Sequence, residues 1–354
     1  MQIDGHHTLT YVLSRMAGFE HSEANTIAYS AQYVDDATNA GIINFTNNAM
    51  FSRISSAHEI SITDMKHYLD AHENHLVWVP FHFLPGNDGE QAGNNVAGSF
   101  IKKLVCKPYS PVAVDLLDAC MHDIDKDYAL HRLGITMHVF ADTFAHKGFA
   151  GVIHDINKVS DLKCHNYDMG FLDMMKSKAL SDNFPMGHGA ALTCPDMPFL
   201  EWSYTNGLGE YVPRNNLDDF SEAALNLFGQ LGLFLNKQGK EVKDYIQEDM
   251  EQIKKNFENF RDDDGEIRHK KWLKSIKNGD FSFGPVDLEY IPKGEGSWKH
   301  QAISQNKEID AKDDKFEFND KFMSSNWRLF HVALKAHRFD IVNTILPKYG
   351  ICVS

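Results

Sequence analysis

The segment HVFADTFAH, residues 138–146, places His138, Asp142 and His146 four residues apart. In an α-helix this spacing turns each side chain only about 40° from the previous one, so the three side chains project from one stripe. Apolar residues fill most of the intervening positions, which argues against the alternative of a polar stripe on a solvated helix. Imidazole and carboxylate groups are typical zinc ligands. The segment therefore predicts a metal site on a buried helix.

Helical spacing of apolar residues recurs along most of the chain and predicts a mainly α fold. We expect helices over residues 6–18, 22–38 with Ser22 as the cap, 63–72, 111–147 as two helices or one bent helix, 217–236, 242–260, one after the charged turn that opens 262–274, and a closing pair over 326–346. Irregular segments are expected over residues 40–62, with a short strand, and over 78–90, 181–216 and 284–318.

The expected architecture is a multi-helix bundle with long irregular loops and a helical C-terminal elaboration. Residues 1–245 would form the metal-binding core, and residues 246–354 would form a helical extension packed on that core within one overall domain. The long loop over residues 181–216 is expected to be functional because it contains His188.

Composition excludes several classes of protein. Hydrophobic residues make up 43% of the chain and charged residues 24%, as in folded globular proteins. The net charge of −14 argues against a broad nucleic-acid-binding surface. We expect no secretory signal and no transmembrane segment, and hence a cytoplasmic protein or one exported by a route that needs no signal peptide. The five cysteines contain no CxxC pair and are expected to be reduced. The oligomeric state stays open.

Further candidate ligands lie far from the central segment in sequence. His6 stands near the start of the first helix, and Asp35 and Asp36 near the end of the second. His82 lies in a loop bounded by prolines, and His188 lies between two glycines upstream of Asp196. Each alone is typical of a structural or surface residue, whereas together they predict one ligand set.

Four fragments in this order resemble the zinc-dependent phospholipase C and single-strand nuclease superfamily, and in particular an uncharacterised bacterial branch of it: GHHTLTYV (5–12), QYVDD (32–36), FHFLPGND (81–88) and HVFADTFAH (138–146). The resemblance covers roughly the first 200 residues and implies two or three zinc ions. It implies a first ion held by Asp35, His82, His138 and Asp142, a second held by His6 and the bridging Asp142, and a third held by His146 with His188 and Asp196, the rival pair being His165 and Asp168.

Two departures from the family pattern bear on this ligand set. Family members complete one zinc site with a processed N-terminal amine, and Asp4 is the candidate substitute in this chain. The family also places its aspartate and the following histidine further apart than Asp142 and His146. In the implied mechanism, Asp35 or its neighbour Asp36 orients the attacking water or accepts its proton.

The function that the resemblance implies is a metal-dependent phosphoric ester hydrolase, specifically a phospholipase C-type phosphodiesterase that acts on a phospholipid or another phosphate ester. A single-strand nuclease or a phosphatase of the same fold is the first alternative, and a non-catalytic metal-binding protein is the second. A helical phosphohydrolase that uses a contiguous His-Asp pair is disfavoured because His122-Asp123 and His154-Asp155 lack further ligands in a suitable order.

Overall fold

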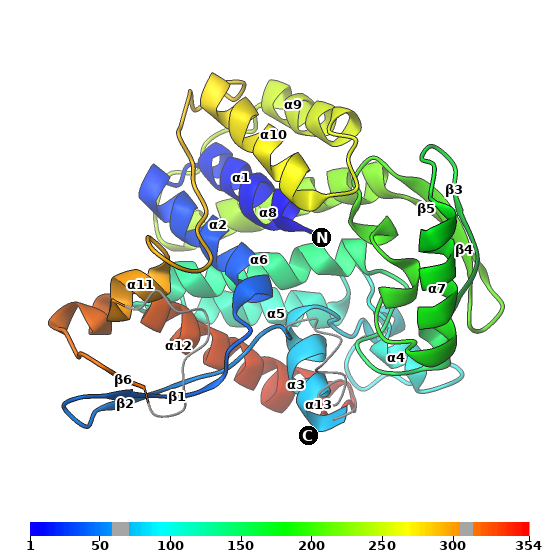
Figure 1. The fold of residues 1–354 in the computed structure, drawn as a ribbon, viewed down its shortest axis with the longest axis horizontal. Coiled ribbons are helices and arrows are strands. Elements are labelled where there is room, and N and C mark those ends of the chain that lie inside the picture. Colours follow the sequence, from blue (N-terminus) through cyan, green and yellow to red (C-terminus); the bar gives the residue numbers. More distant parts are fainter. Residues whose placement is uncertain (59–70, 305–313, 354) are drawn as a thin grey trace.

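The computed structural model describes residues 1–58, 71–304 and 314–353, and most of them are helical (Figure 1). The α-helices are α1 (Thr10–Ala17), α2 (His21–Asp36), α3 (Ala71–Phe81), α4 (Ile101–Leu104), α5 (Pro111–His122), α6 (Ala129–Ala145), α7 (Phe171–Asn183), α8 (Asn216–Lys237), α9 (Gln247–Asn259), α10 (Gly265–Asn278), α11 (Trp298–Ile303), α12 (Asn326–Phe339) and α13 (Leu346–Lys348). The prediction of a mainly α fold is confirmed, whereas the helix expected over residues 63–72 falls largely outside the described residues.

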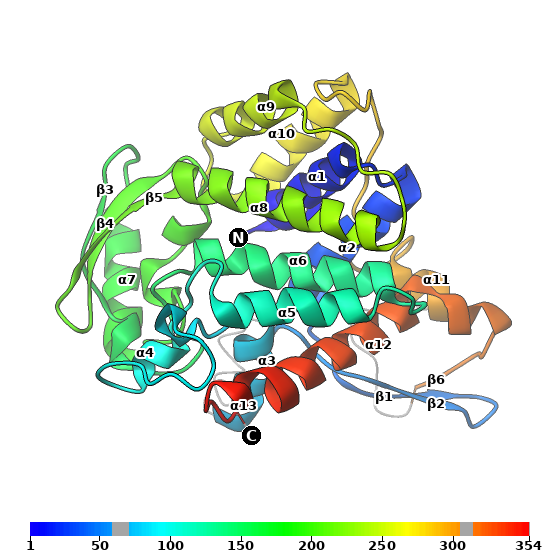
Figure 2. The same ribbon diagram turned by 180° about the vertical axis from the view of Figure 1, so that it is seen from behind.

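Helix α6 is the centre of the fold. It packs against α2, α5, α8 and α12, and Figure 2 shows α5, α6 and α8 running side by side. Every residue of α6 except Leu130 is buried, which explains why apolar residues surround its polar stripe. Gly134 allows the close approach of α2, because a Cβ at this position would lie 2.3 Å from the carbonyl oxygen of Ile27. For residues 111–147 we expected two helices or one bent helix, and the structure has two separate helices, α5 and α6.

The first two predicted helices are present. A π-helical turn (Asp4–Leu9) leads directly into α1, which ends at Gly18 in the left-handed conformation with φ 119°. Helix α2 begins at His21, two residues before the start that a cap at Ser22 would give, and it ends at Asp36, so Ser22 is not its cap. The cap is Glu20, whose side chain and that of Glu23 form a reciprocal capping box.

Two small three-stranded sheets flank the helices. The first has the order β2 (Met50–Arg53), β1 (Gly41–Phe45), β6 (Lys315–Phe316), which confirms a strand within residues 40–62. The second has the order β3 (Val159–Cys164), β4 (Glu201–Asn206), β5 (Tyr211–Asn215), all antiparallel. The expectation of a loop throughout residues 181–216 is therefore wrong. Residues 202–204 are buried in succession, so this strand lacks the alternation that reveals a half-buried strand.

Two other boundaries differ from the expected ones. Helix α3 continues through Pro80 to Phe81, so the irregular segment expected over residues 78–90 begins later. The expected closing pair is one nearly continuous run, because α12 passes through a π-helical turn (Asp340–Ile345) into α13. Of residues 284–318, the structure describes 284–304 and 314–318; these are mainly irregular, as expected, but contain α11 and β6.

The C-terminal part of the chain shares the main hydrophobic core with the N-terminal part. Leu9 and Phe140 lie in the same cluster of buried residues as Trp272 and Ile341. Figure 1 shows α9 and α10 beside α1 and α8, and α12 crossing on the other side of α6. None of the described helices combines the length and apolar character that crossing a membrane requires.

Candidate metal centre

The polar stripe of α6 is buried at the C-terminal end of the helix. His138 and Asp142 lie within the helix, and His146 is the residue just after it, with its N–H donating to the Asp142 carbonyl at 2.8 Å. All three side chains are at most 4% exposed. The predicted stripe therefore exists, and it faces the protein interior.

A buried arginine fixes the end of this helix. The guanidinium of Arg214, from β5, donates to the carbonyl oxygens of Phe144 at 3.2 Å and Ala145 at 3.0 Å. Asp219 holds the same guanidinium through a bond of 3.0 Å between its Oδ2 and the arginine Nε. Because the last carbonyls of a helix lack intrahelical partners, this contact defines where α6 stops and how His146 is presented.

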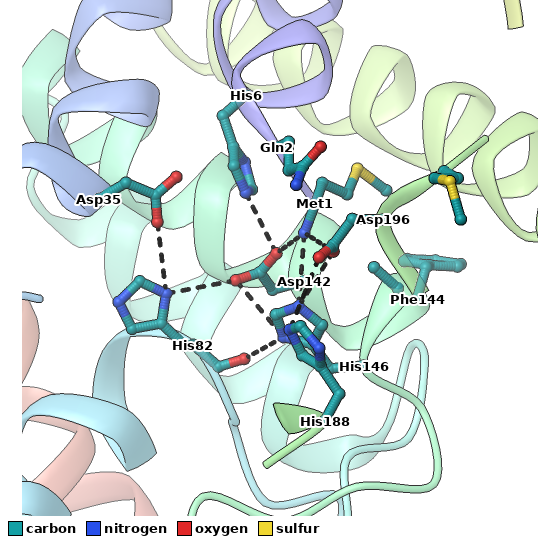
Figure 3. Close-up of polar contacts among 12 residues, drawn as sticks. Met1, Gln2, His6, Asp35, His82, Asp142, Phe144, His146, His188 and Asp196 are labelled. Atoms are coloured by element: carbon teal, nitrogen blue, oxygen red, sulfur yellow. Dashed lines mark hydrogen bonds and ion pairs between the residues drawn. The ribbon is translucent and has the colours of Figure 1, made fainter. Parts of the chain in front are cut away.

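Asp142 lies at the centre of the candidate site (Figure 3). Its Oδ1 is 2.6 Å from the α-amino nitrogen of Met1 and 3.2 Å from His6 Nε2. Its Oδ2 is 3.3 Å from His138 Nε2 and 3.5 Å from His82 Nδ1. Groups from three separate parts of the sequence, the N-terminal residues, the turn that carries His82 and α6 itself, thus converge on one carboxylate.

Two further carboxylates extend the cluster to either side. Asp35 Oδ1 is 3.7 Å from His82 Nδ1 and 3.9 Å from His138 Nε2. On the other side, Asp196 Oδ1 is 3.6 Å from His146 Nε2, and Asp196 Oδ2 is 3.7 Å from His188 Nε2. Three groups of side chains could each hold a metal ion: His6, Asp35 and His138; His82, His138 and Asp142; and His146, His188 and Asp196.

Backbone carbonyls orient the histidine rings of the site. His138 Nδ1 lies 2.8 Å from the carbonyl of Ala31, and His146 Nδ1 lies 2.9 Å from the carbonyl of His82. His188 Nδ1 makes the same kind of contact with Leu192 at 3.0 Å. Since a carbonyl only accepts, these nitrogens carry the proton, and the opposite nitrogen of each neutral ring is left with a lone pair. This is the arrangement that orients metal-ligating histidines in proteins.

Around Asp142 the electrostatics favour neutral rings at His6, His138 and His146 and an ionised carboxylate, whereas Asp142 and Asp35 raise the pKa of His82 despite its burial. Burial lowers the pKa of His6, His138 and His146 to about 4. Despite its burial, Asp142 has a pKa held well below its usual value by His146 and the Met1 ammonium. Burial alone would lower the pKa of that ammonium, but the neighbouring carboxylates outweigh it and raise the pKa to about 10.

This arrangement leaves several buried acceptors without a hydrogen. The His138 Nε2 lone pair faces Asp142 Oδ2, and among the described residues that oxygen has no hydrogen-bond donor. Asp196 Oδ1 lies 3.2 Å from the Met1 ammonium but makes no hydrogen bond with the described residues. His6 Nε2 is close to Asp142 Oδ1 yet also has no hydrogen-bond partner there. Buried polar atoms without partners are costly, and cations between these groups would satisfy them. The residues therefore fit a metal with nitrogen and oxygen ligands.

A cavity of about 700 Å³ opens onto this cluster. Asp35, His82, Asp142, His146 and His188 line its polar part. The rest of the wall is mainly apolar and includes Trp78, Phe83, Ile153, Leu180, Phe184 and Met186. No lysine or arginine is among the described residues that line it. A substrate could thus reach the candidate metal ligands through an apolar chamber.

The structure places two predicted site residues, Asp4 and Asp36, elsewhere. Both carboxylate oxygens of Asp4 contact Arg268, so Asp4 does not join the cluster as a substitute ligand. The Oδ2 of Asp36 accepts from Tyr290 at 2.6 Å and from Gln32 at 3.1 Å, and Asp36 does not line the cavity. Asp36 points away because it follows Asp35 on a helix, where consecutive residues face different directions.

The rival pair for the third group also lies outside the cluster. His165 is exposed and contacts Ser203 at 3.0 Å through Nε2, and Asp168 is exposed. The Met1 amine is the group that the sequence analysis missed in this chain. The resemblance could have indicated this group, because the family uses an N-terminal amine as a ligand, but Asp4 was expected to replace it.

No disulfide is present among the described residues.

Comparison with curated proteins and with solved structures gives no match. One family description, a family of unknown function (DUF6765), matches residues 1–345, nearly the whole chain. On this match, the chain belongs to the DUF6765 family.

Proposed function

We propose that this protein is a zinc-dependent phosphoric ester hydrolase of the phospholipase C type, with two or three ions held around Asp142. The proposal rests on one observation: lone pairs of neutral histidines face ionised carboxylates in a buried cluster, with His138 Nε2 only 3.3 Å from Asp142 Oδ2. Such a set of acceptors is stable when cations lie between them.

The arrangement of ligands supports the resemblance to the zinc-dependent phospholipase C superfamily. The ordered fragments that carry the resemblance contribute His6, Asp35, His82, His138 and Asp142, which the fold brings together. The Met1 amino group lies 2.6 Å from Asp142 and 3.2 Å from Asp196, where the family's N-terminal amine ligand would be expected. Asp142 would then be a ligand of two ions, and His146, His188 and Asp196 would hold the third.

Zinc ions in such a site supply a nucleophile at neutral pH, by lowering the pKa of water, and neutralise charge on the phosphoryl group. The residues of the chain position the reactants. Asp35 lines the cavity, its side chain is a third exposed, and burial raises its pKa to about 6. We assign Asp35 the role of orienting the attacking water and accepting its proton, because it is the carboxylate of this helix that faces the cavity.

The apolar lining of the cavity favours a substrate with an apolar substituent. Trp78, Phe83 and Leu180 can cover such a group, whereas the described lining has no cationic side chain to bind the successive phosphates of a nucleic acid. The chain's net charge of −14 also disfavours the binding of a nucleic acid. A phospholipid or another apolar phosphodiester therefore fits the site better than single-stranded DNA does.

Hydrolysis of three substrates tests the proposal. The zinc-loaded protein is assayed with a short-chain phosphatidylcholine, bis(p-nitrophenyl) phosphate and single-stranded DNA, alongside Asp142→Asn, Asp35→Asn and the matched neighbour Asp36→Asn. We expect turnover of the two phosphodiesters of low molecular mass, its loss in Asp142→Asn and Asp35→Asn, and its retention in Asp36→Asn. Undiminished hydrolysis by Asp142→Asn would refute the proposal, and preferred cleavage of DNA would assign the nuclease function instead.

A further inference from the structure

Arg268 is a fully buried guanidinium that the proposed reaction does not use. It lies on α10, in the C-terminal part of the chain, and its exposed fraction is 0%. Its Nε donates to Asp4 Oδ2 at 2.7 Å, and its Nη2 lies 3.1 Å from Asp4 Oδ1, so the two groups form a bidentate pair. Its Nη1 donates to the carbonyl oxygen of Asp262 at 2.6 Å. These contacts fix the plane of the guanidinium.

The same guanidinium holds the N-terminal arm, defined as residues 1–7. Nη2 donates to the side-chain oxygen of Gln2 at 2.7 Å. The backbone carbonyl of Gln2 in turn accepts from the N–H groups of Gly5 and His6, each at 2.9 Å. Gln2 therefore connects Arg268 both to the neighbouring Met1 amine and to the turn that carries His6.

Arg268 also reaches the opposite side of the candidate metal centre. Its Nη2 lies 3.2 Å from the backbone carbonyl oxygen of Asp196. The carboxylate of Asp196 lies 3.2 Å from the Met1 amine and is part of the third ligand group. One nitrogen thus links the N-terminal arm to the segment that presents Asp196.

The packing of α10 is adapted to this link. A Cβ on Gly265 would lie 2.6 Å from Gln2 Oε1, so only glycine lets the first turn of α10 approach the arm this closely. One residue after Arg268, His269 Nε2 lies 2.9 Å from His7 Nδ1 and makes a second contact with the arm. The arm is therefore held along α10 at more than one point.

We propose that Arg268 is a positioning residue that sets the distance between the Met1 amine and Asp196 and thereby the affinity of the metal centre. The inference rests on the metal centre of the proposed function but not on its reaction. A simple buried ion pair would need only Asp4, whereas the guanidinium divides its contacts: Nε and Nη2 hold Asp4, Nη2 also lies within 3.2 Å of Gln2 Oε1 and of the Asp196 carbonyl, and Nη1 donates to the Asp262 carbonyl. Lysine carries its donors on a single nitrogen, so it could hold Asp4 but could not reach all of these acceptors from one point.

Zinc affinity of the full-length protein, measured by competition with a chromogenic chelator, tests this role. The variants are Arg268→Lys, which keeps the charge beside Asp4, and Gln2→Ala, which removes only the link to the arm. Arg261→Lys is the matched control, because Arg261 is exposed and precedes the same helix. Thermal unfolding of each chelator-treated protein is measured in parallel, so that loss of affinity can be separated from loss of stability.

We expect the affinity of the most weakly held zinc ion to fall about 10- to 100-fold in Arg268→Lys and in Gln2→Ala, as is typical when a group that orients metal ligands is lost. The control should bind zinc like the wild type. Wild-type affinity in Arg268→Lys would overturn the inference. Should that variant fail to fold, wild-type zinc affinity in Gln2→Ala would overturn the inference instead. A wild type that binds zinc tightly but hydrolyses no phosphate ester would refute only the proposed function.

Discussion

Replacing Asp142 by asparagine removes one charge while keeping the size of the side chain. In chelator-treated protein the buried Met1 ammonium then loses its ion pair of 2.6 Å with Asp142, and its remaining ion pair is with Asp196, at 3.2 Å. Removing one partner of a buried ion pair costs about 3 to 5 kcal/mol. We expect the free energy of unfolding to fall by about 3 kcal/mol, the lower end of this range, because the second carboxylate remains.

Zinc should increase the difference in the free energy of unfolding between the wild type and Asp142→Asn. A ligand that binds only the folded state at a free concentration 1,000 times its Kd stabilises that state by about 4 kcal/mol for each site. Asp142 belongs to one ligand group and lies 3.2 Å from His6 and 3.6 Å from His146, which belong to the other two. Asp142→Asn should therefore lose most of this gain, whereas the wild type keeps it.

Urea unfolding with and without zinc measures both effects. The matched control is Asp118→Asn, which changes an exposed aspartate on α5 and should leave the midpoint and its response to zinc unchanged. Equal stabilisation by zinc in the wild type and in Asp142→Asn would refute the reasoning, since it would place the ions away from this carboxylate.

Three further predictions concern the Met1 amine, the packing of α2 on α6 and two buried histidines. Two residues added before Met1 should displace the amine and lower the zinc content per chain, whereas a tag after the C-terminal residue should not; elemental analysis of both proteins decides between equal and unequal content. Gly134→Ala should destabilise the fold by about 1 to 3 kcal/mol in urea, because the added methyl group would overlap Ile27, and an unchanged midpoint would contradict the close packing of α2 on α6. Burial lowers the pKa of His131 to about 4 and that of His331 to about 3, below the value near 6.5 of the unfolded chain. The unfolded state therefore binds protons that the folded state excludes, and stability should fall below pH 6.5, by roughly 4 kcal/mol for the two residues at pH 5. Urea midpoints at pH 7.5, 6 and 5 measure this, and the fall should be smaller when both residues are replaced by glutamine.

The α6 stripe could be predicted from sequence because its geometry is local. A spacing of four residues on a helix places His138, Asp142 and His146 on one side of it, independently of contacts with the rest of the chain. The π-helical turn and α1, α2, α5 and α6 were predictable for the same reason, since periodic apolar residues encode the buried side of a helix.

Long-range partners could not be derived in this way. The pairing of Asp4 with Arg268 joins residues 264 positions apart, and no local pattern marks Asp4 as the partner of an arginine and not of a metal. The choice of Asp35 over Asp36 depends on which side of α2 faces the cavity, and this is set by packing on α6. The β4–β5 hairpin was missed because consecutive buried residues hide the alternation of its first strand.

The central claim is that separate parts of the chain converge on Asp142 to hold several metal ions. Anomalous diffraction from zinc-loaded crystals, recorded on both sides of the zinc absorption edge, tests it most directly. The account predicts two or three anomalous peaks beside the carboxylates of Asp142, Asp35 and Asp196, with neighbouring ions about 3.5 to 4 Å apart where Asp142 bridges them. Zinc peaks located elsewhere, or no ion bound at these carboxylates, would contradict it.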